Sequence, residues 1–177
     1  MATKTKVVFD SKRWASEILK KVSEEQTSRL IAYAKDQINN IGVDIESKAT
    51  KNNLDRTGNL LDSLCWGVFY NGKVQDFGFY RGDEASGISH LHEWSRPMGQ
   101  QVDGHLMAEQ FIAKYTTKTK KGWEVFFAVL APYWGYWEKG FSVGNKTYHF
   151  SVMSHFFDAI KKDLEPSDVK LSVYVPS

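Results

Sequence analysis

The chain has 177 residues, of which 42% are hydrophobic and 25% are charged, close to ordinary globular usage. This length suits one domain with a core of its own, so we expect residues 1–177 to form a single domain. The 23 basic and 21 acidic residues leave a net charge of +2, which excludes a global field that attracts nucleic acid, so any DNA contact has to be local.

Cysteine usage and hydropathy indicate where the protein is made. Cys65 is the single cysteine and can form no internal disulfide, which is typical of a reducing cytoplasm. It lies in an apolar run, so we interpret it as a buried structural thiol and not as a nucleophile. The N-terminus lacks the apolar stretch of a signal peptide, and no segment approaches the roughly 18 apolar residues that span a bilayer. We therefore expect a soluble, non-secreted protein.

The first predicted element is a long helix that follows a polar N-terminal arm of residues 1–9. Asp10 and Ser11 can cap a helix that runs to about Ile41, with Gly42 placed to end it. Steps of three and four predict one apolar face that packs on a sheet or another helix. This face contains Trp14, Ile18, Val22, Leu30, Ala34, Ile38 and Ile41. Because such a helix is long for a small domain, one end can project and meet a neighbouring subunit.

A polar loop over residues 46–56 is predicted next, and it leads into a turn with Gly58 at its pivot. Leu60, Leu61 and Leu64 follow at a spacing that suits a short helical turn or the start of a strand.

Two aromatic and β-branched runs, residues 64–70 and 73–80, are joined by Asn71 and Gly72. Since an Asn-Gly pair readily adopts a type I′ turn, these runs predict an antiparallel hairpin. Gly67 and Gly78 within the strands suggest bulges or close backbone approach.

Residues 81–121 show no clean period and are predicted to form a long loop insertion, with a short helix or strand at 106–115. A strand at 123–130, a short strand at 146–150 and a helix that ends at Leu164 follow. The last predicted strand alternates apolar and polar residues over 169–175. The predicted fold class is α+β. We expect a small antiparallel sheet, packed on one face against the long N-terminal helix and the C-terminal helix.

Residues 131–140 place four large aromatic residues within five positions, between a proline and a glycine. Four such side chains in an extended segment cannot all face one core, so we expect some of them at a subunit interface. These residues are Tyr133, Trp134, Tyr136 and Trp137.

Together, residues 56–64 and 131–140 resemble the tail-completion and head–tail joining proteins of long-tailed bacteriophages. In that family an arginine-threonine-glycine-apolar turn precedes the first strand, and an alanine-proline-tyrosine segment ending in glutamate-x-glycine follows the central hairpin. The helix predicted to end at Leu164 closes the pattern. The matching positions are Arg56, Thr57, Gly58 and Leu60 in the first motif and Tyr133, Trp137, Glu138 and Gly140 in the second.

The resemblance implies a structural virion protein without enzymatic activity or a cofactor. It implies a subunit of a homo-oligomeric ring, sixfold or a multiple of it, that joins the portal region of the capsid to the tail around the DNA channel. Its partners would be other neck, tail and portal proteins, and it would be made in the host bacterial cytoplasm. The second motif is more aromatic and residues 81–121 are longer than the family pattern, so a terminator or an adaptor layer stays an alternative.

Two local patterns suggest other chemistry. His90 and His92 would point the same way in a strand, and with His105 they make a metal-dependent enzyme the alternative from another class. Their order does not match His-Glu-x-x-His, however, and paired loop histidines are mostly hydrogen-bonding surface groups. The second pattern is a basic run that can contact DNA phosphates or an acidic partner, although a solvated loop is the simpler interpretation. This run contains Lys114, Lys118, Lys120 and Lys121.

Overall fold

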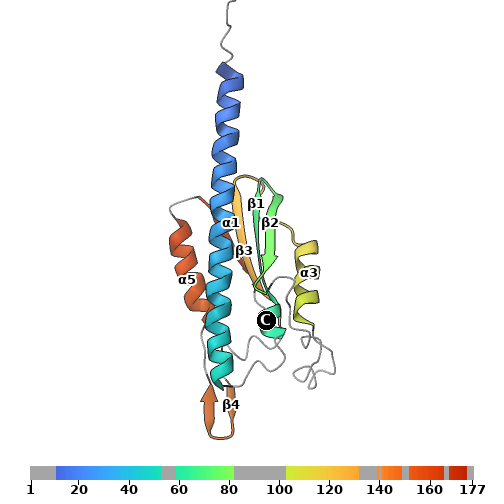
Figure 1. Cartoon of the computed structure of the whole chain (residues 1–177), viewed down its shortest axis with the longest axis vertical. Coiled ribbons are helices and arrows are strands. Elements are labelled where there is room, and N and C mark those ends of the chain that lie inside the picture. The colour runs from blue at the N-terminus through green and yellow to red at the C-terminus, as the bar shows by residue number, and fades with distance from the viewer. Residues whose placement is uncertain are drawn as a thin grey trace, which may run out of the picture.

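A computed structural model of the chain describes residues 11–52, 59–81, 103–131, 139, 141–148, 152–165 and 168–174 (Figure 1). The helices are α1 (Ser11–Asn52), α2 (Asn59–Asp62), α3 (Gly104–Lys114) and α5 (Val152–Leu164). The strands are β1 (Leu64–Tyr70), β2 (Lys73–Phe79), β3 (Trp123–Val129), β4 (Phe141–Val143), β5 (Lys146–Tyr148) and β6 (Lys170–Tyr174). The predicted α+β class is therefore confirmed.

The main sheet has the strand order β2-β1-β3-β6. Strand β1 pairs antiparallel with both β2 and β3, but β6 runs parallel to β3. The sheet is thus mixed and not wholly antiparallel. The reason is that α5 carries the chain back along the sheet after β3, and such a helical crossover returns the next strand in the parallel sense.

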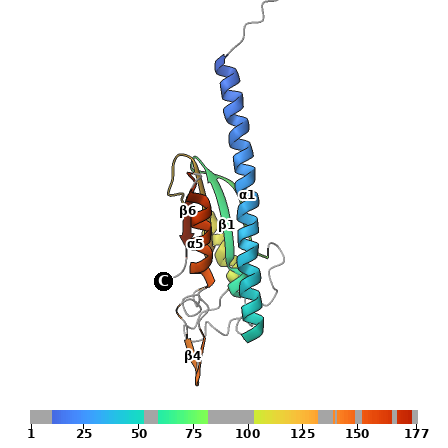
Figure 2. The ribbon, with the colours of Figure 1, turned by 90° about the vertical axis from the view of Figure 1, so that its left-hand side faces the viewer.

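Helices cover both faces of this sheet. Helices α1 and α5 share one face and α3 lies on the opposite one, as the two perpendicular views show (Figures 1 and 2). Side chains of β1 alternate accordingly: Trp66 and Val68 belong to the core under α1, whereas Cys65 and Phe69 belong to the core under α3. The prediction placed the helices on one face of the sheet only, whereas α3, which lies within residues 81–121, supplies a second layer on the other face.

Helix α1 continues to Asn52, so the prediction that Gly42 ends it is wrong, as is the loop predicted from Glu46. Gly42 is buried, and a Cβ built on it would lie 2.3 Å from the ring of Tyr80. The glycine serves close packing of the aromatic ring and not a helix end. Ile45, one turn beyond it, is fully buried and holds the continuing helix on the sheet.

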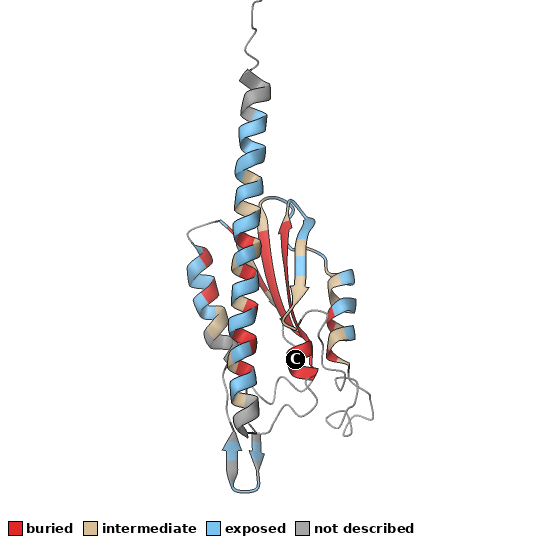
Figure 3. Cartoon of the chain, viewed as in Figure 1, coloured by how far each residue is buried: buried red, intermediate tan, exposed pale blue. Residues whose placement is uncertain are grey.

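The apolar face of α1 divides into a buried and an exposed part. Leu30, Ala34 and Ile38 are buried, but Ile18 and Val22 are 40% and 56% exposed. An α-helix turns by about 100° per residue, so residues spaced four apart shift around the helix axis with each step. Ile18 and Val22 therefore lie about 100° or more around the axis from the buried face of α1. The N-terminal part of α1 projects beyond the sheet, as its pale blue colour in Figure 3 shows. The expected projection is confirmed.

The hairpin was predicted correctly. Asn71 and Gly72 have φ angles of 50° and 77°, as a type I′ turn requires. The two strand glycines allow close approach: a Cβ on Gly67 would lie 2.4 Å from the Phe126 ring, and one on Gly78 would lie 3.0 Å from the Trp66 indole. The register shift falls between Val68 and Phe69 and not at a glycine.

The remaining short elements were predicted in part. The segment predicted as a helix or strand at 106–115 is the helix α3, and the short strand at 146–150 is β5. Strand β4, which pairs antiparallel with β5 in a separate hairpin, was not predicted.

Candidate functional site

The structure describes one end of each motif segment. Leu60 of the first motif lies in α2 and is fully buried, and Ala131 opens the second motif directly after β3. The other predicted motif and interface residues lie outside the described residues. These are Arg56, Thr57, Gly58, Tyr133, Trp134, Tyr136, Trp137, Glu138 and Gly140.

A single buried hydroxyl joins the two motif segments. Ser63 Oγ accepts hydrogen bonds from the backbone nitrogens of Leu130 at 3.3 Å and Ala131 at 3.1 Å. It also donates to the carbonyl oxygen of Leu60 at 2.8 Å. Ser63 has no solvent exposure. We call this arrangement the motif junction, because it fixes the first described residue of the second motif on the turn that opens the sheet.

The same turn also receives the start of α3. The amide of Gly104 donates to Asn59 Oδ1 at 3.0 Å, and a Cβ on Gly104 would lie 2.1 Å from the carbonyl oxygen of Asn59. Asp103 caps α3 by accepting the amide of Leu106 at 3.0 Å. Only a glycine can therefore let α3 begin this close to α2.

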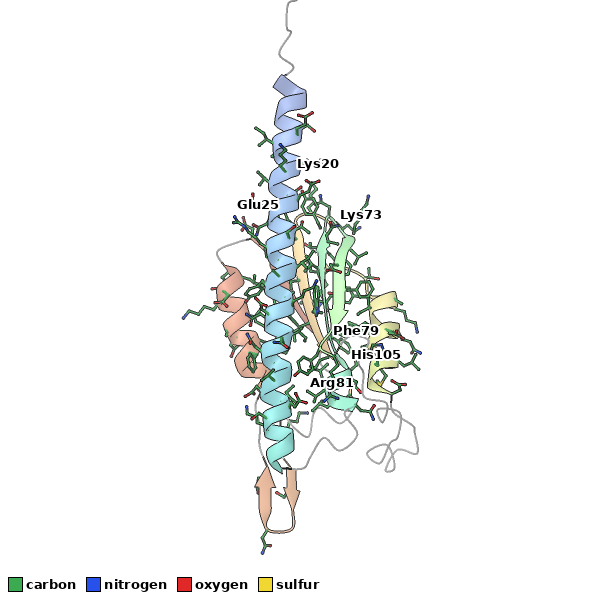
Figure 4. All side chains as sticks on the ribbon, viewed as in Figure 1. Lys20, Glu25, Lys73, Phe79, Arg81 and His105 are labelled. Carbon is green, nitrogen blue, oxygen red and sulfur yellow. The ribbon has the colours of Figure 1, made fainter. Side chains whose placement is uncertain are left out.

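Arg81 links the turn to α1. Its guanidinium lies 3.3 Å from Asp62 Oδ1, a fully buried carboxylate, and 3.3 Å from Glu46 Oε1 (Figure 4). Tyr80 donates its hydroxyl to Glu46 Oε2 at 3.2 Å. Burial, followed by the charge of Glu46, raises the pKa of Tyr80 above its ordinary value. The end of β2 is thereby tied to two helices.

These contacts gather at one end of the sheet. The turn α2, the start of α3 at Gly104, Arg81 and the C-terminal part of α1 all lie at the end opposite to the projecting N-terminal part of α1 (Figure 1). Leu60 was predicted from its motif, whereas Ser63, Asn59 and Gly104 were not predicted as site residues. The one readable signal was Asp103, an N-cap residue directly before the apolar spacing of α3.

The candidate metal ligands are only partly described. His105 Nε2 lies 3.4 Å from Glu109 Oε1, and its ring packs on Phe79 with 4.6 Å between the centroids (Figure 4). Its Nδ1 is buried without a hydrogen-bond partner in the described part of the chain. His90 and His92 lie outside the described residues. Among the residues that are described, no group of three His, Cys, Asp or Glu side chains could hold a metal ion.

The basic run is exposed, but the loop that carries it is anchored. Glu124 of β3 is fully buried and accepts hydrogen bonds from Tyr115 at 2.7 Å, Thr119 N at 2.8 Å and Ser172 at 2.9 Å. Burial, together with the hydrogen bond to Glu124, raises the pKa of Tyr115 well above its usual range. Lys114, Lys118, Lys120 and Lys121 are all exposed around this anchor.

None of the described helices is long and apolar enough to cross a membrane. No family model, no curated protein and no solved structure matches the chain.

Proposed function

We propose that this chain is a structural subunit of a tailed bacteriophage. In this proposal it forms a ring in the neck or at the tail end, between the portal region of the capsid and the tail, and the DNA passes through the ring. The observation that supports this function best is the motif junction. The two segments that together resemble the family meet at one buried hydroxyl, through Ser63 and Ala131, which are 68 positions apart in the sequence.

The chemistry of the junction favours a structural role over a catalytic one. Ser63 accepts two backbone amides and has no solvent exposure, so its hydroxyl is unsuited to act as a nucleophile. Burial raises the pKa of the neighbouring Cys65 thiol well above its usual range, which disfavours the reactive thiolate. The groups at the junction position backbone segments.

Two separate apolar patches supply the surface that assembly requires. The first patch, on the projecting part of α1, consists of Ile18, Leu19 and Val22, with Leu19 69% exposed. The second patch is formed by Val74 and Phe77 on β2, whose outer edge pairs with no other described strand. A ring is built by contacts between unlike patches of identical subunits, and this chain presents two such patches.

Pockets beside β2 offer a place for such a contact. A pocket of about 560 Å³ lies between α1 and β2 and includes Trp66, Phe77 and Tyr80 in its lining. A second pocket, of about 580 Å³, lies on the other face of β2 against α3. Two apolar patches and adjacent pockets would suit a tail-completion, a terminator or an adaptor layer equally well. We propose the tail-completion or neck layer because the motif resemblance is to that family.

The proposal is tested by the mass of the purified full-length chain on a sizing column with light scattering, followed by negative-stain imaging. We expect rings with a central hole, alone or after mixing with phage portal and tail proteins. The double variant Ile18→Glu/Val22→Glu should not assemble. Lys20→Glu changes the net charge by the same two units on the opposite face of the projecting helix and should still assemble. A compact monomer under all of these conditions would refute the proposal.

A further inference from the structure

A cluster of exposed lysines lies at the end of the sheet from which α1 projects. Lys73 follows the β1–β2 turn, and the other members lie at the end of α3 and in the loop before β3. No salt bridge joins any of them to an acidic residue in the described part of the chain, whereas Lys35 and Arg81 are both paired. We call these residues the tip lysines: Lys73, Lys114, Lys118, Lys120 and Lys121.

Direct contacts bring the two lysine-bearing segments together. The amide of Asn71 donates to Gly122 O at 2.9 Å, and the amide of Gly122 donates to Asn71 Oδ1 at 2.8 Å. A Cβ on Gly72 would lie 3.5 Å from Thr117 Oγ1, so the hairpin turn touches the loop. Figure 4 shows Lys73 at the tip of the hairpin. Five positive charges thus share one end of the sheet, with Lys73 brought from the hairpin to the four lysines of residues 114–121.

Nearby acidic residues do not neutralise this surface by direct pairing. Glu124 lies below the loop, but its oxygens accept Tyr115, Thr119 and Ser172 and are fully buried. Asp76 of β2 pairs with Lys35 at 3.3 Å. The Glu124 anchor therefore holds the loop against the sheet while the lysine side chains stay in solvent.

We propose that the tip lysines bind the phosphate backbone of double-stranded DNA without reading its sequence. This inference rests on the proposed function, in which DNA passes through the ring, and it adds the surface that meets the DNA. Lysine is a point charge suited to phosphate, and this cluster contains no arginine, whose planar fork would favour bidentate contacts with bases. Asn71 Oδ1 accepts the amide of Gly122, so this side chain cannot make the bidentate contact by which asparagine reads adenine.

The aromatic residues beside the tip lysines also favour a duplex over a single strand. Single-stranded nucleic acid is bound mainly by stacking of bases on exposed rings. Here Tyr115 stacks on Phe126 with 4.4 Å between ring centroids, and Trp123 packs on Tyr70 at 4.6 Å. These rings are buried or half-buried and packed on one another, whereas the lysines are exposed, so the charges supply most of the contact surface.

The test measures fluorescence anisotropy of a labelled 30-base-pair duplex against the full-length chain from 50 to 200 mM NaCl. Each phosphate contact contributes a slope of about −0.9 in a plot of log affinity against log salt concentration. With all five lysines in contact, affinity should fall about 500-fold over this range. The affinity of the variant Lys118→Gln/Lys120→Gln/Lys121→Gln should fall only about 12-fold over the same range. At 50 mM NaCl this variant should bind the duplex more weakly than the native chain.

A matched control removes the same charge elsewhere. Lys21→Gln/Lys161→Gln/Lys162→Gln changes exposed helix lysines and should retain the native salt dependence. Equal losses in the two triple variants, or no duplex binding at 50 mM NaCl, would overturn the inference. Displacement of the duplex by an equal charge of polyglutamate would also overturn it, in favour of an acidic protein partner. Rings that do not bind DNA refute this inference alone, whereas a monomer that binds DNA through these lysines refutes the ring.

Discussion

Replacing Ser63 with alanine tests whether the motif junction holds the fold as its geometry indicates. The variant removes the acceptor of two buried amides, those of Leu130 and Ala131. The carbonyl oxygen of Leu60 also accepts the backbone amide of residue 63 at 3.3 Å. Loss of the hydroxyl donor therefore costs this oxygen little. Each orphaned buried amide costs about 1–3 kcal/mol, and the longer bond to Leu130 belongs at the low end. We therefore expect the free energy of unfolding to fall by about 3 kcal/mol.

Urea unfolding followed by tryptophan fluorescence measures this loss, because Trp66 is buried in the core. With a dependence of about 2 kcal/mol per molar urea, the unfolding midpoint should drop by about 1.5 M. Ser142→Ala is the matched control, since the Ser142 hydroxyl is exposed and lies 3.1 Å from Thr147 Oγ1 in the β4–β5 hairpin. It should change stability by less than about 0.5 kcal/mol. If the two variants lose equal stability, the Ser63 hydroxyl does not join the segments as argued.

Three further predictions concern single residues. Gly104→Ala should lower the free energy of unfolding by about 1–3 kcal/mol through the clash with Asn59 O, and an unchanged thermal midpoint would contradict the packing. Cys65 should react with Ellman's reagent at pH 8 only after unfolding in urea, because burial keeps it a neutral thiol. The pKa of Tyr115 is raised above its ordinary 10.0, so its neutral phenol stabilises the fold below pH 10, and this contribution is lost as the pH rises further. Tyr115→Phe should therefore lose less stability than the native chain between pH 10 and 12, and equal losses would count against this assignment.

Local signals in the sequence predicted the elements that depend on local contacts. The hairpin follows from Asn71 and Gly72, whose positive φ angles are a property of the turn itself. The C-terminal helix follows from its apolar spacing and ends at Leu164 as predicted. The predicted end of α1 was wrong because a glycine ends a helix only where no other segment packs on it. Here the ring of Tyr80 packs on Gly42. The parallel pairing of β6 was missed because adjacent strand order is not a local property.

The candidate site was less predictable than the fold, since its contacts cross long stretches of sequence. In the sequence Ser63 is a polar residue beside apolar ones and carries no distinguishing signal. Its role depends on the hydrogen bonds that it accepts from Leu130 and Ala131, which lie far along the chain. In the sequence Gly104 is one of several glycines within residues 81–121, and only its contact with Asn59 distinguishes it. The motif resemblance concerns residues 56–64 and 131–140, and it does not say which atoms join these two segments.

The two ends of the main sheet are joined by a stiff connection. Strands β1 and β3 are buried almost throughout and pair directly along their length, with Leu64 opposite Val129 at one end and Tyr70 opposite Trp123 at the other. Along the helical face, α1 spans the same distance and is tied to α5 by the hydrogen bond from Tyr33 to Asp163, 3.1 Å long. Side chains packed this densely do not absorb displacements independently.

The motif junction at one end and the tip lysines at the other are therefore held in a fixed relation, while the projecting part of α1 extends beyond this frame (Figure 1). Lysine substitutions at the tip change exposed charges and leave the buried frame intact, so they should alter DNA affinity without altering assembly. Substitutions at Ile18 and Val22 should do the reverse, because these side chains are exposed on a segment that the core does not need. Changes at Ser63 act on the frame itself and should impair both properties together. This separation of effects is what a rigid subunit with distinct contact surfaces requires, and a flexible chain would mix them.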